Sequence, residues 1–182
     1  MSFMTECFKS VINSDTFVAQ IVGFIPLILA LFVFVHNNRK KIIFFKFCTD
    51  FLWAIHFFML GELSGAIVNV INTARNLIFS QKGKKWASNK MMPVIFCILI
   101  SVCTLITDDS FKSIFPLLGS CLATIGFWQN TPEKIRLFNF LGIFLWLIYG
   151  FLTISISTII SNIISLISII LPTAFKKIKK KN

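Results

Sequence analysis

Hydrophobic residues occur along this chain in long runs that short polar or basic segments separate. The runs lack the alternation of a half-buried strand, and a helix of about 20 apolar residues crosses the hydrocarbon core of a bilayer. A helix also satisfies its own backbone hydrogen bonds in lipid. The pattern therefore predicts an all-α membrane protein with seven spans, at residues 16–35, 42–60, 63–79, 91–106, 112–128, 135–153 and 155–171.

Two end segments complete the predicted organisation. Residues 1–15 are mixed in polarity and form an N-terminal segment outside the membrane. Residues 172–182 begin with Pro172 and continue as a tail rich in lysine. Because proline lacks the backbone N–H that a helix interior needs, we expect the seventh helix to end there.

The composition agrees with a membrane protein and excludes other classes. The chain is 56% hydrophobic and 14% charged, with a mean hydropathy of +0.83, whereas soluble domains are about 25% charged. A disordered chain and a soluble α/β enzyme are excluded. A net charge of +11 is also compatible with a protein that binds nucleic acid. Here, however, the basic residues lie in short clusters between apolar runs, so we expect no nucleic-acid partner.

The placement of basic residues predicts the orientation. Seven spans put the two termini on opposite sides of the membrane. The side of the C-terminus then carries 14 of the 18 basic residues, and the other side carries two, Lys9 and Lys112. Because loops rich in lysine and arginine stay in the cytoplasm, we expect a cytoplasmic C-terminus and an N-terminus outside.

The first three spans and the last three repeat each other. A shift of 93 residues aligns three notable pairs without gaps, which are Trp53 with Trp146, Asn69 with Asn162, and His56 with Tyr149. One span separates the two triplets, so both begin on the same side of the membrane. We expect a 3+1+3 architecture of two parallel repeats, 16–79 and 112–171, joined by a linker helix at 91–106. Such repeats hold a substrate site near the midplane at their interface.

Each repeat carries a tryptophan, fifteen further residues, and then an asparagine. At about 1.5 Å per helical residue, Trp53, Asn69, Trp146 and Asn162 all lie near mid-membrane. One interpretation is that they hold the helices together, with asparagine bonding across helices and tryptophan filling a gap. The other is a shared central pocket, and duplication at matched depth favours it. We expect His56 and Tyr149 to be packing rings or to lie at the edge of this pocket.

One segment resembles a known transporter family. Residues 145–150 read Leu-Trp-Leu-Ile-Tyr-Gly and are followed by Asn162, similar to the second and third helices of SWEET and SemiSWEET sugar transporters. The resemblance implies that Trp53, Asn69, Trp146 and Asn162 clamp the substrate. The Pro-Gln pair of the PQ-loop motif is absent from both first helices.

Over residues 20–171 the chain more closely resembles the YgjV-type family of bacterial inner-membrane proteins. This resemblance implies a multi-pass protein of the bacterial inner membrane. The vitamin-importing PnuC family is similar in architecture, so the fold leaves the substrate open.

The second span carries a possible coupling residue. Asp50 lies one turn after Lys46, and an intramembrane carboxylate is a candidate proton carrier. The alternative is a structural ion pair with Lys46 or Arg75. We favour the ion pair because isoleucine stands at the equivalent position of the second repeat, and on this basis we expect an Asp50→Asn variant to insert normally.

The third span carries a polar stripe. Asn69, Asn72 and Asn76 are spaced three and four residues apart, so they share one helix face, which we expect to face the protein interior. Asn72 is therefore a further candidate substrate contact. Arg75 lies near the cytoplasmic end of this span, and we expect its side chain to snorkel to the interface. The alternative is a substrate or gate contact.

Together these features predict a transporter that moves a small uncharged polar solute, similar to a sugar, by alternating access. A nucleoside or vitamin transporter is the alternative within this architecture, and a non-transporting receptor or assembly protein is the alternative outside it. The sequence holds no zincin, nucleophile-elbow, P-loop or dinucleotide-binding motif. We expect no enzymatic activity, no cofactor and no metal, with membrane lipids as the other partners.

Overall fold

The computed structural model describes residues 14–107 and 110–179, so the predicted segment 1–15 lies almost entirely outside the described residues. The described part is all-helical and contains no strand. Its α-helices are α2 (Ser14–Val33), α3 (Arg39–Met59), α4 (Leu63–Ser80), α5 (Met92–Thr107), α6 (Ile114–Trp128), α7 (Pro132–Leu152) and α8 (Ile156–Lys179). Two short 3-10 helices, η1 (Lys85–Ser88) and η2 (Phe111–Ser113), precede α5 and α6.

Six of the seven predicted helices agree with the observed bounds to within three residues. The seventh is longer than expected, because α8 continues through Pro172 to Lys179. The prediction that Pro172 ends this helix was therefore wrong. A proline removes one hydrogen bond of the helical ladder, but the turns on either side keep theirs, so the helix is able to continue.

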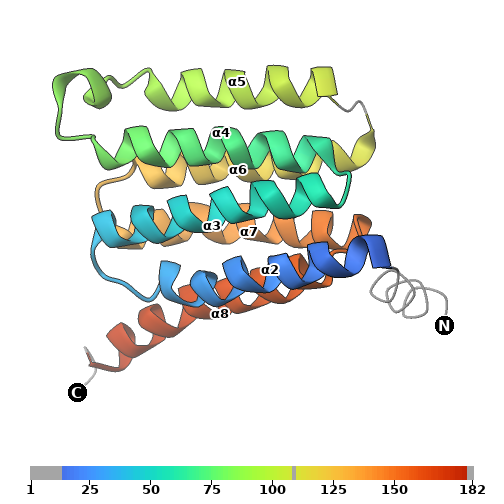
Figure 1. Cartoon of the computed structure of the whole chain (residues 1–182). Helices are drawn as coiled ribbons and strands as arrows, with labels where there is room; N and C mark the ends of the chain where they lie inside the picture. The colour runs from blue at the N-terminus through green and yellow to red at the C-terminus, as the bar shows by residue number, and fades with distance from the viewer. Residues whose placement is uncertain (1–13, 108–109, 180–182) are drawn as a thin grey trace.

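Successive helices run in opposite directions, as Figure 1 shows. α2, α4, α6 and α8 finish at the same end of the bundle, and we call this the basic end. The other end holds the short α3–α4 and α7–α8 connections and is called the opposite end. The start of α2 lies at the opposite end and the last turn of α8 at the basic end. The described chain therefore begins and finishes at different ends of the bundle.

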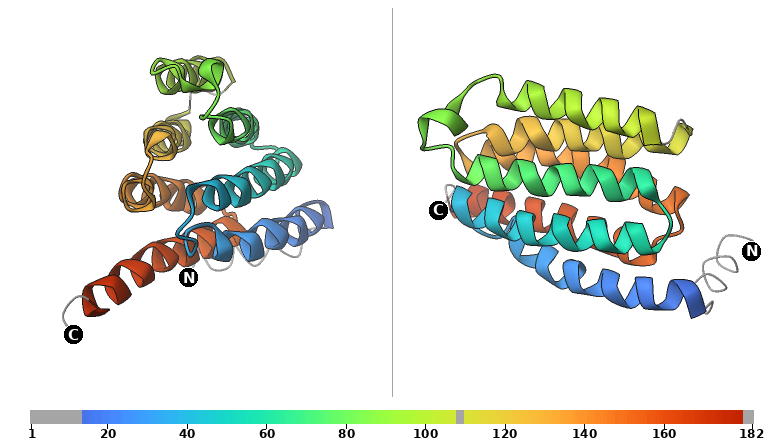
Figure 2. Two further views of the ribbon diagram at one scale, coloured as in Figure 1. Left: turned by 90° about the vertical axis from the view of Figure 1, so that its left-hand side faces the viewer. Right: turned by 45° about the horizontal axis from the view of Figure 1, so that its top comes forward.

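The helices form an open stack of pairs. Seen end-on in Figure 2, α2 lies beside α8 at the bottom, α3 beside α7 above them, and α4 beside α6 above these. α3 packs on α2 and α4, and α7 packs on α6 and α8. α5 lies at the top, against α4 and α6. The α3–α7 pair therefore forms the middle of the stack, with α4 and α6 on one side and α2 and α8 on the other.

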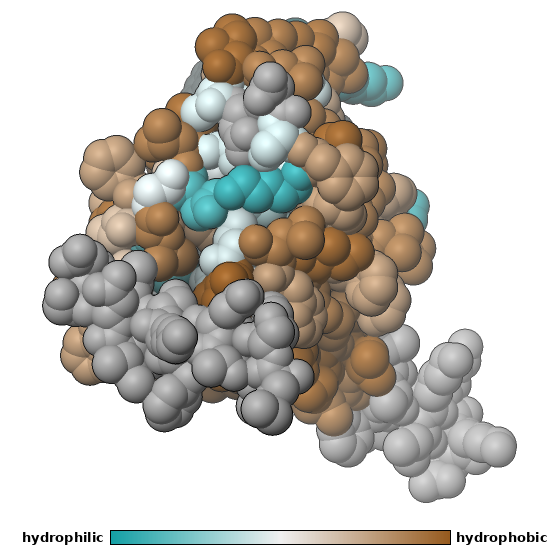
Figure 3. All heavy atoms as spheres, turned by 90° about the vertical axis from the view of Figure 1, so that its right-hand side faces the viewer, coloured by the Kyte–Doolittle hydropathy of each residue, from teal (hydrophilic) through white to brown (hydrophobic). Residues whose placement is uncertain are grey.

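Exposure is inverted relative to a soluble protein. Many large apolar side chains face outward, among them Phe58 at 69% and Leu105 at 68% exposed. Side chains buried inside the bundle include Asp50, His56, Asn69 and Arg75. Figure 3 views the opposite end, where a small hydrophilic patch is surrounded by hydrophobic residues. An apolar exterior around polar groups is the arrangement expected of a bundle in lipid.

By length and composition, three of the described helical segments can cross a membrane: Arg39–Met59, Phe111–Trp128 and Pro132–Leu152. Shorter apolar helices are Phe17–Val33, Met92–Thr107 and Ile156–Pro172. α4 is in neither group, because its asparagines and Arg75 lower its hydropathy. Those polar residues are buried, so the stripe of α4 faces the interior as predicted.

Candidate functional site

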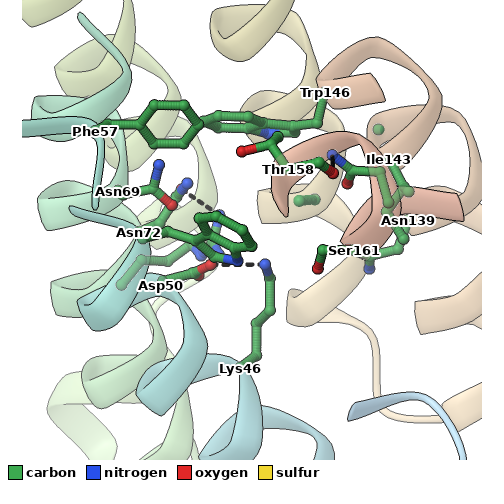
Figure 4. Close-up of a pocket in the computed structure, with 15 residues that line it drawn as sticks. Lys46, Asp50, Phe57, Asn69, Asn72, Asn139, Ile143, Trp146, Thr158 and Ser161 are labelled. Atoms are coloured by element: carbon green, nitrogen blue, oxygen red, sulfur yellow. Dashed lines mark hydrogen bonds and ion pairs between the residues drawn. The ribbon is translucent and has the colours of Figure 1, made fainter. Parts of the chain in front are cut away.

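A cavity lies at mid-height in the bundle, where α3 and α4 face α7 and α8 (Figure 4). Its free space is about 50 Å³, enough for a few water molecules. Small-molecule sites usually enclose about 300–1,000 Å³, so this cavity is smaller than a typical small-molecule site. Its walls are formed by Lys46, Asp50, Trp53, Phe57, Asn69, Asn72, Arg75, Ala123, Asn139, Gly142, Ile143, Trp146, Thr158, Ser161 and Asn162.

The cavity brings together most of the residues singled out in the sequence. Both tryptophans and both asparagines of the repeated pattern line it, and so do Asp50, Asn72 and Arg75. His56 and Tyr149 do not line it; both are fully buried beside it. Phe57, Asn139, Thr158 and Ser161 also line the cavity, although they are not among the candidate substrate contacts named from the sequence. Their helical spacing from the repeated tryptophans and asparagines was the sequence feature that could have placed them in the cavity wall.

Aromatic rings close the cavity toward the opposite end. Phe57 lies 5.9 Å from Trp53 and 5.9 Å from Trp146, measured between ring centroids. Tyr149 lies 5.5 Å from Phe57 and 5.6 Å from Trp146. Figure 4 shows Phe57 and Trp146 side by side across one end of the cavity. These rings therefore cover the cavity on the side of the opposite end.

The two asparagines of the repeated pattern make the same local hydrogen bond. The amide nitrogen of Asn69 donates to the carbonyl of Gly65 at 2.8 Å, and that of Asn162 donates to the carbonyl of Thr158 at 3.0 Å. Each amide nitrogen keeps a second proton, and each side chain keeps its carbonyl oxygen as an acceptor. The pair therefore offers donors and acceptors from opposite walls of the cavity.

Asp50 is shared by two cations. Its Oδ1 lies 2.6 Å from Nζ of Lys46, and its Oδ2 lies 3.6 Å from Nη2 of Arg75. Asn76 also donates to Oδ2 at 2.8 Å. The ion pairing considered in the sequence analysis is therefore present with both candidate partners. Proton coupling through Asp50 remains a prediction.

Arg75 is fully buried, so the expectation that it snorkels to the interface was wrong. Its Nη1 donates to Asn72 at 2.8 Å and to Thr124 at 2.9 Å, and its Nε and Nη2 donate to Asn76 at 3.2 and 3.0 Å. The Phe127 ring lies 5.1 Å from the guanidinium carbon. Residues on α4 and α6 therefore accept the hydrogen bonds of the guanidinium, which polar groups at the interface would otherwise accept. Asn72 also donates to Ser120 at 2.9 Å, so its polar groups are largely engaged.

His56 and Tyr149 connect helices behind the cavity. Nδ1 of His56 bonds to the carbonyl of Ala19 at 2.8 Å, and its Nε2 bonds to Ser155 at 2.9 Å. The hydroxyl groups of Tyr149 and Ser64 lie 3.3 Å apart. His56 on α3 therefore bonds to α2 and to the residue just before α8. Tyr149 on α7 bonds to α4.

Two arginines at the basic end entered the sequence analysis only in the count of basic residues that predicts the orientation. Arg39, at the start of α3, donates to the carbonyls of Phe127 and Gln129 at the end of α6, at 3.1 and 3.0 Å. Arg136, in α7, donates to the carbonyl of Phe34 after α2, at 3.0 Å. We call these contacts the arginine latches. A cation at a helix N-terminus is unfavourable because it faces the positive end of the helix dipole. The position of Arg39 at the start of α3 was therefore the sequence feature that indicated partners elsewhere.

Lys82 makes further contacts at the basic end. Its ammonium donates to the carbonyl of Trp128 and to Oδ1 of Asn130, and it lies over the Trp128 ring. Burial, and then the nearby charge of Arg39, lower the pKa of Lys82. Arg39, Arg136 and Lys82 thus bond to main-chain carbonyls of other helices or loops at the basic end. Among the described residues, no cluster of three or more His, Cys, Asp or Glu side chains is placed to hold a metal ion.

Comparison with known proteins gives one match. The sequence model of the Imp-YgjV family, described as bacterial inner membrane protein, matches residues 17–181. No curated protein and no solved structure matches the chain. The family match covers nearly the whole chain, including every residue that lines the cavity.

Proposed function

We propose, because this chain belongs to the Imp-YgjV family of bacterial inner membrane proteins, that it carries a small polar solute across the inner membrane through the central cavity. The observation that carries the proposal is the convergence of Trp53, Asn69, Trp146 and Asn162 on this one cavity from four helices. The two tryptophans offer apolar faces on which a ring stacks, and the asparagines offer hydrogen bonds to its polar groups. A sugar-like solute fits this chemistry, and a nucleoside or vitamin ring is the alternative.

The proposed architecture is two parallel repeats, α2–α4 and α6–α8, joined by α5. Equivalent contacts support it. The asparagine-to-carbonyl bonds of Asn69 and Asn162 occupy matching positions, 93 residues apart. The α3–α4 turn has Gly61 at φ +74, and the α7–α8 turn has Ile154 at φ +53, again at matching positions. A positive φ is strained for isoleucine but not for glycine. The second turn therefore keeps the shape of the first although isoleucine stands where the first has glycine.

The proposed mechanism is alternating access, in which one repeat rocks against the other around the cavity. The small size of the cavity and its closure by aromatic rings at one end and arginine latches at the other support an occluded intermediate of such a cycle. The latches are reciprocal, since α3 of the first repeat caps α6 of the second and α7 of the second caps the segment after α2 of the first. Opening the basic end therefore requires both to break.

The proposal predicts that cavity variants lose transport while folding is retained. Replacing Trp53 or Trp146 by alanine removes a stacking surface worth about 0.5–1.5 kcal/mol beyond area burial. Replacing Asn69 or Asn162 by alanine removes hydrogen bonds worth about 0.5–1.5 kcal/mol. We expect each change to weaken uptake of labelled sugars, nucleosides or vitamins into proteoliposomes about two- to tenfold.

The matched control is Trp86→Ala, because Trp86 is 54% exposed and does not line the cavity. This variant should transport as the wild type does. If the cavity variants instead lose membrane expression while the surviving protein keeps full specific activity, these residues hold the bundle together and form no substrate site. A wild type that binds a solute but moves none would support the receptor alternative.

We also propose that the basic end faces the cytoplasm. Reporter fusions at Lys112, which pairs with Glu62 at the opposite end, and after the C-terminus should give opposite signals for periplasmic and cytoplasmic location. The reason is the concentration of lysine and arginine at the basic end. Equal signals from the two fusions would exclude both seven spans and parallel repeats.

A further inference from the structure

We infer that the solute is a monoanion: a ring-bearing carboxylate whose negative charge lies against Lys46. This inference rests on the proposed function and replaces the expectation of an uncharged solute. Its basis is the charge of the cavity wall, which differs between the two halves.

All of the charge in the wall comes from α3 and α4. The cavity is lined by two cations, Lys46 and Arg75, and by one acid, Asp50. The wall from α7 and α8 carries amides, hydroxyls and apolar groups, with Asn139 at the repeat position of Lys46. The cavity wall therefore carries one positive charge in excess.

The two cations have different surroundings. Arg75 is fully buried, and Asn72, Asn76, Thr124 and Asp50 occupy its donors. Lys46 is 25% exposed at its side chain, and Asp50 is its ion-pair partner within the described part of the chain. An ammonium has three donors, so Lys46 retains hydrogen-bonding capacity beyond that contact. The excess charge is therefore available at Lys46.

Figure 4 shows the Lys46 ammonium pointing into the cavity, between Asp50 and Ser161. An anion bound here lies against Lys46 and neutralises the wall. Coulomb attraction is stronger in this environment than in water, because the effective dielectric constant is lower. A dianion leaves one negative charge in excess, and a cation adds to the positive excess. A single negative charge therefore matches this wall best.

The remaining contacts specify the rest of the solute. Trp53 and Trp146 provide apolar faces, which suit a ring rather than a short unbranched acid. Asn69 and Asn162 add donors and acceptors for substituents on that ring. The carboxylate at Lys46 and the ring between the tryptophans together fix the orientation of the solute.

The test compares acids with neutral relatives of the same shape. Thermal unfolding of the purified full-length protein is measured in detergent with two pairs of probes, benzoate with benzamide and glucuronate with glucose. A ligand that binds the folded state raises the unfolding midpoint according to its concentration relative to its Kd. In at least one pair, we expect the acid to give the same stabilisation at an about tenfold lower concentration than its neutral relative.

Two variants of Lys46 and one control variant assign the preference to one side chain. Lys46→Gln leaves Asp50 paired with Arg75, so it should remain folded and lose the preference for the acid. Lys46→Arg keeps the charge and should keep the preference. Lys41→Gln removes an exposed lysine at the basic end and should behave as the wild type does.

Each other outcome overturns the inference. Equal stabilisation by acid and neutral relative means that the cavity binds uncharged solutes, which leaves the proposed transport standing. A preference that persists in Lys46→Gln places the anion elsewhere. Stabilisation by none of the four probes removes the assignment of solute class, and the uptake assay then decides separately whether the proposed transport stands.

Discussion

Asp50→Asn should destabilise the folded bundle by about 3–5 kcal/mol, the cost of leaving a buried charge without its partner. Asp50 is the acid that lies within ion-pair distance of both Lys46 and Arg75. Without it, the fully buried Arg75 keeps only neutral partners and faces a second cation. The contacts of Asp50 thus predict a loss of stability, whereas the sequence alone led us to expect normal insertion. Thermal unfolding in detergent, together with the fraction of monodisperse protein, measures the effect.

The matched control is Glu62→Gln, which also converts an acid to an amide beside a lysine. Glu62 pairs with Lys112 at 2.8 Å, but both side chains are partly exposed, and such pairs contribute about 0–1 kcal/mol. A double variant, Asp50→Asn with Arg75→Met, should recover part of the stability because no buried arginine remains. Equal stability of Asp50→Asn and Glu62→Gln would show that Arg75 does not need its carboxylate.

Loss of the arginine latches should open the basic end. Hydrogen bonds from charged donors contribute about 1.5–3 kcal/mol each. Arg39→Gln or Arg136→Gln should therefore shift the closed–open equilibrium about tenfold to hundredfold toward the open state, and the double variant should shift it further. The physical reason is that Arg39 and Arg136 each donate to carbonyls of the other repeat.

Cysteine labelling measures this shift. Ser161→Cys places a thiol in the cavity wall, in a chain whose native cysteines have been replaced. A membrane-impermeant thiol reagent is added from the side of the basic end. Labelling should accelerate in the latch variants and stay at the wild-type rate in Lys41→Gln, which loses a charge at the same end without breaking a latch. Unchanged labelling in the double latch variant would mean that these arginines do not close the cavity.

The sequence by itself determined the helices and the depth of their polar residues. Apolar runs and helical periodicity are local properties, so the helix bounds and the buried stripe of α4 follow from them. A constant rise per residue gives Trp53 and Asn69 the same depth as their counterparts. One local expectation was wrong: Pro172 was expected to end a helix, but α8 continues through it because the turns on either side keep their hydrogen bonds.

Only the tertiary structure decided which groups meet. Arg75 was expected at the interface and lies buried, because Thr124 on α6 and Asp50 on α3 reach it there. The latch between Arg136 and Phe34 joins residues 102 positions apart. The sharing of Asp50 between two cations likewise depends on how α4 packs against α3. Such contacts depend on the rotation and separation of packed helices, which the spacing along one helix does not specify.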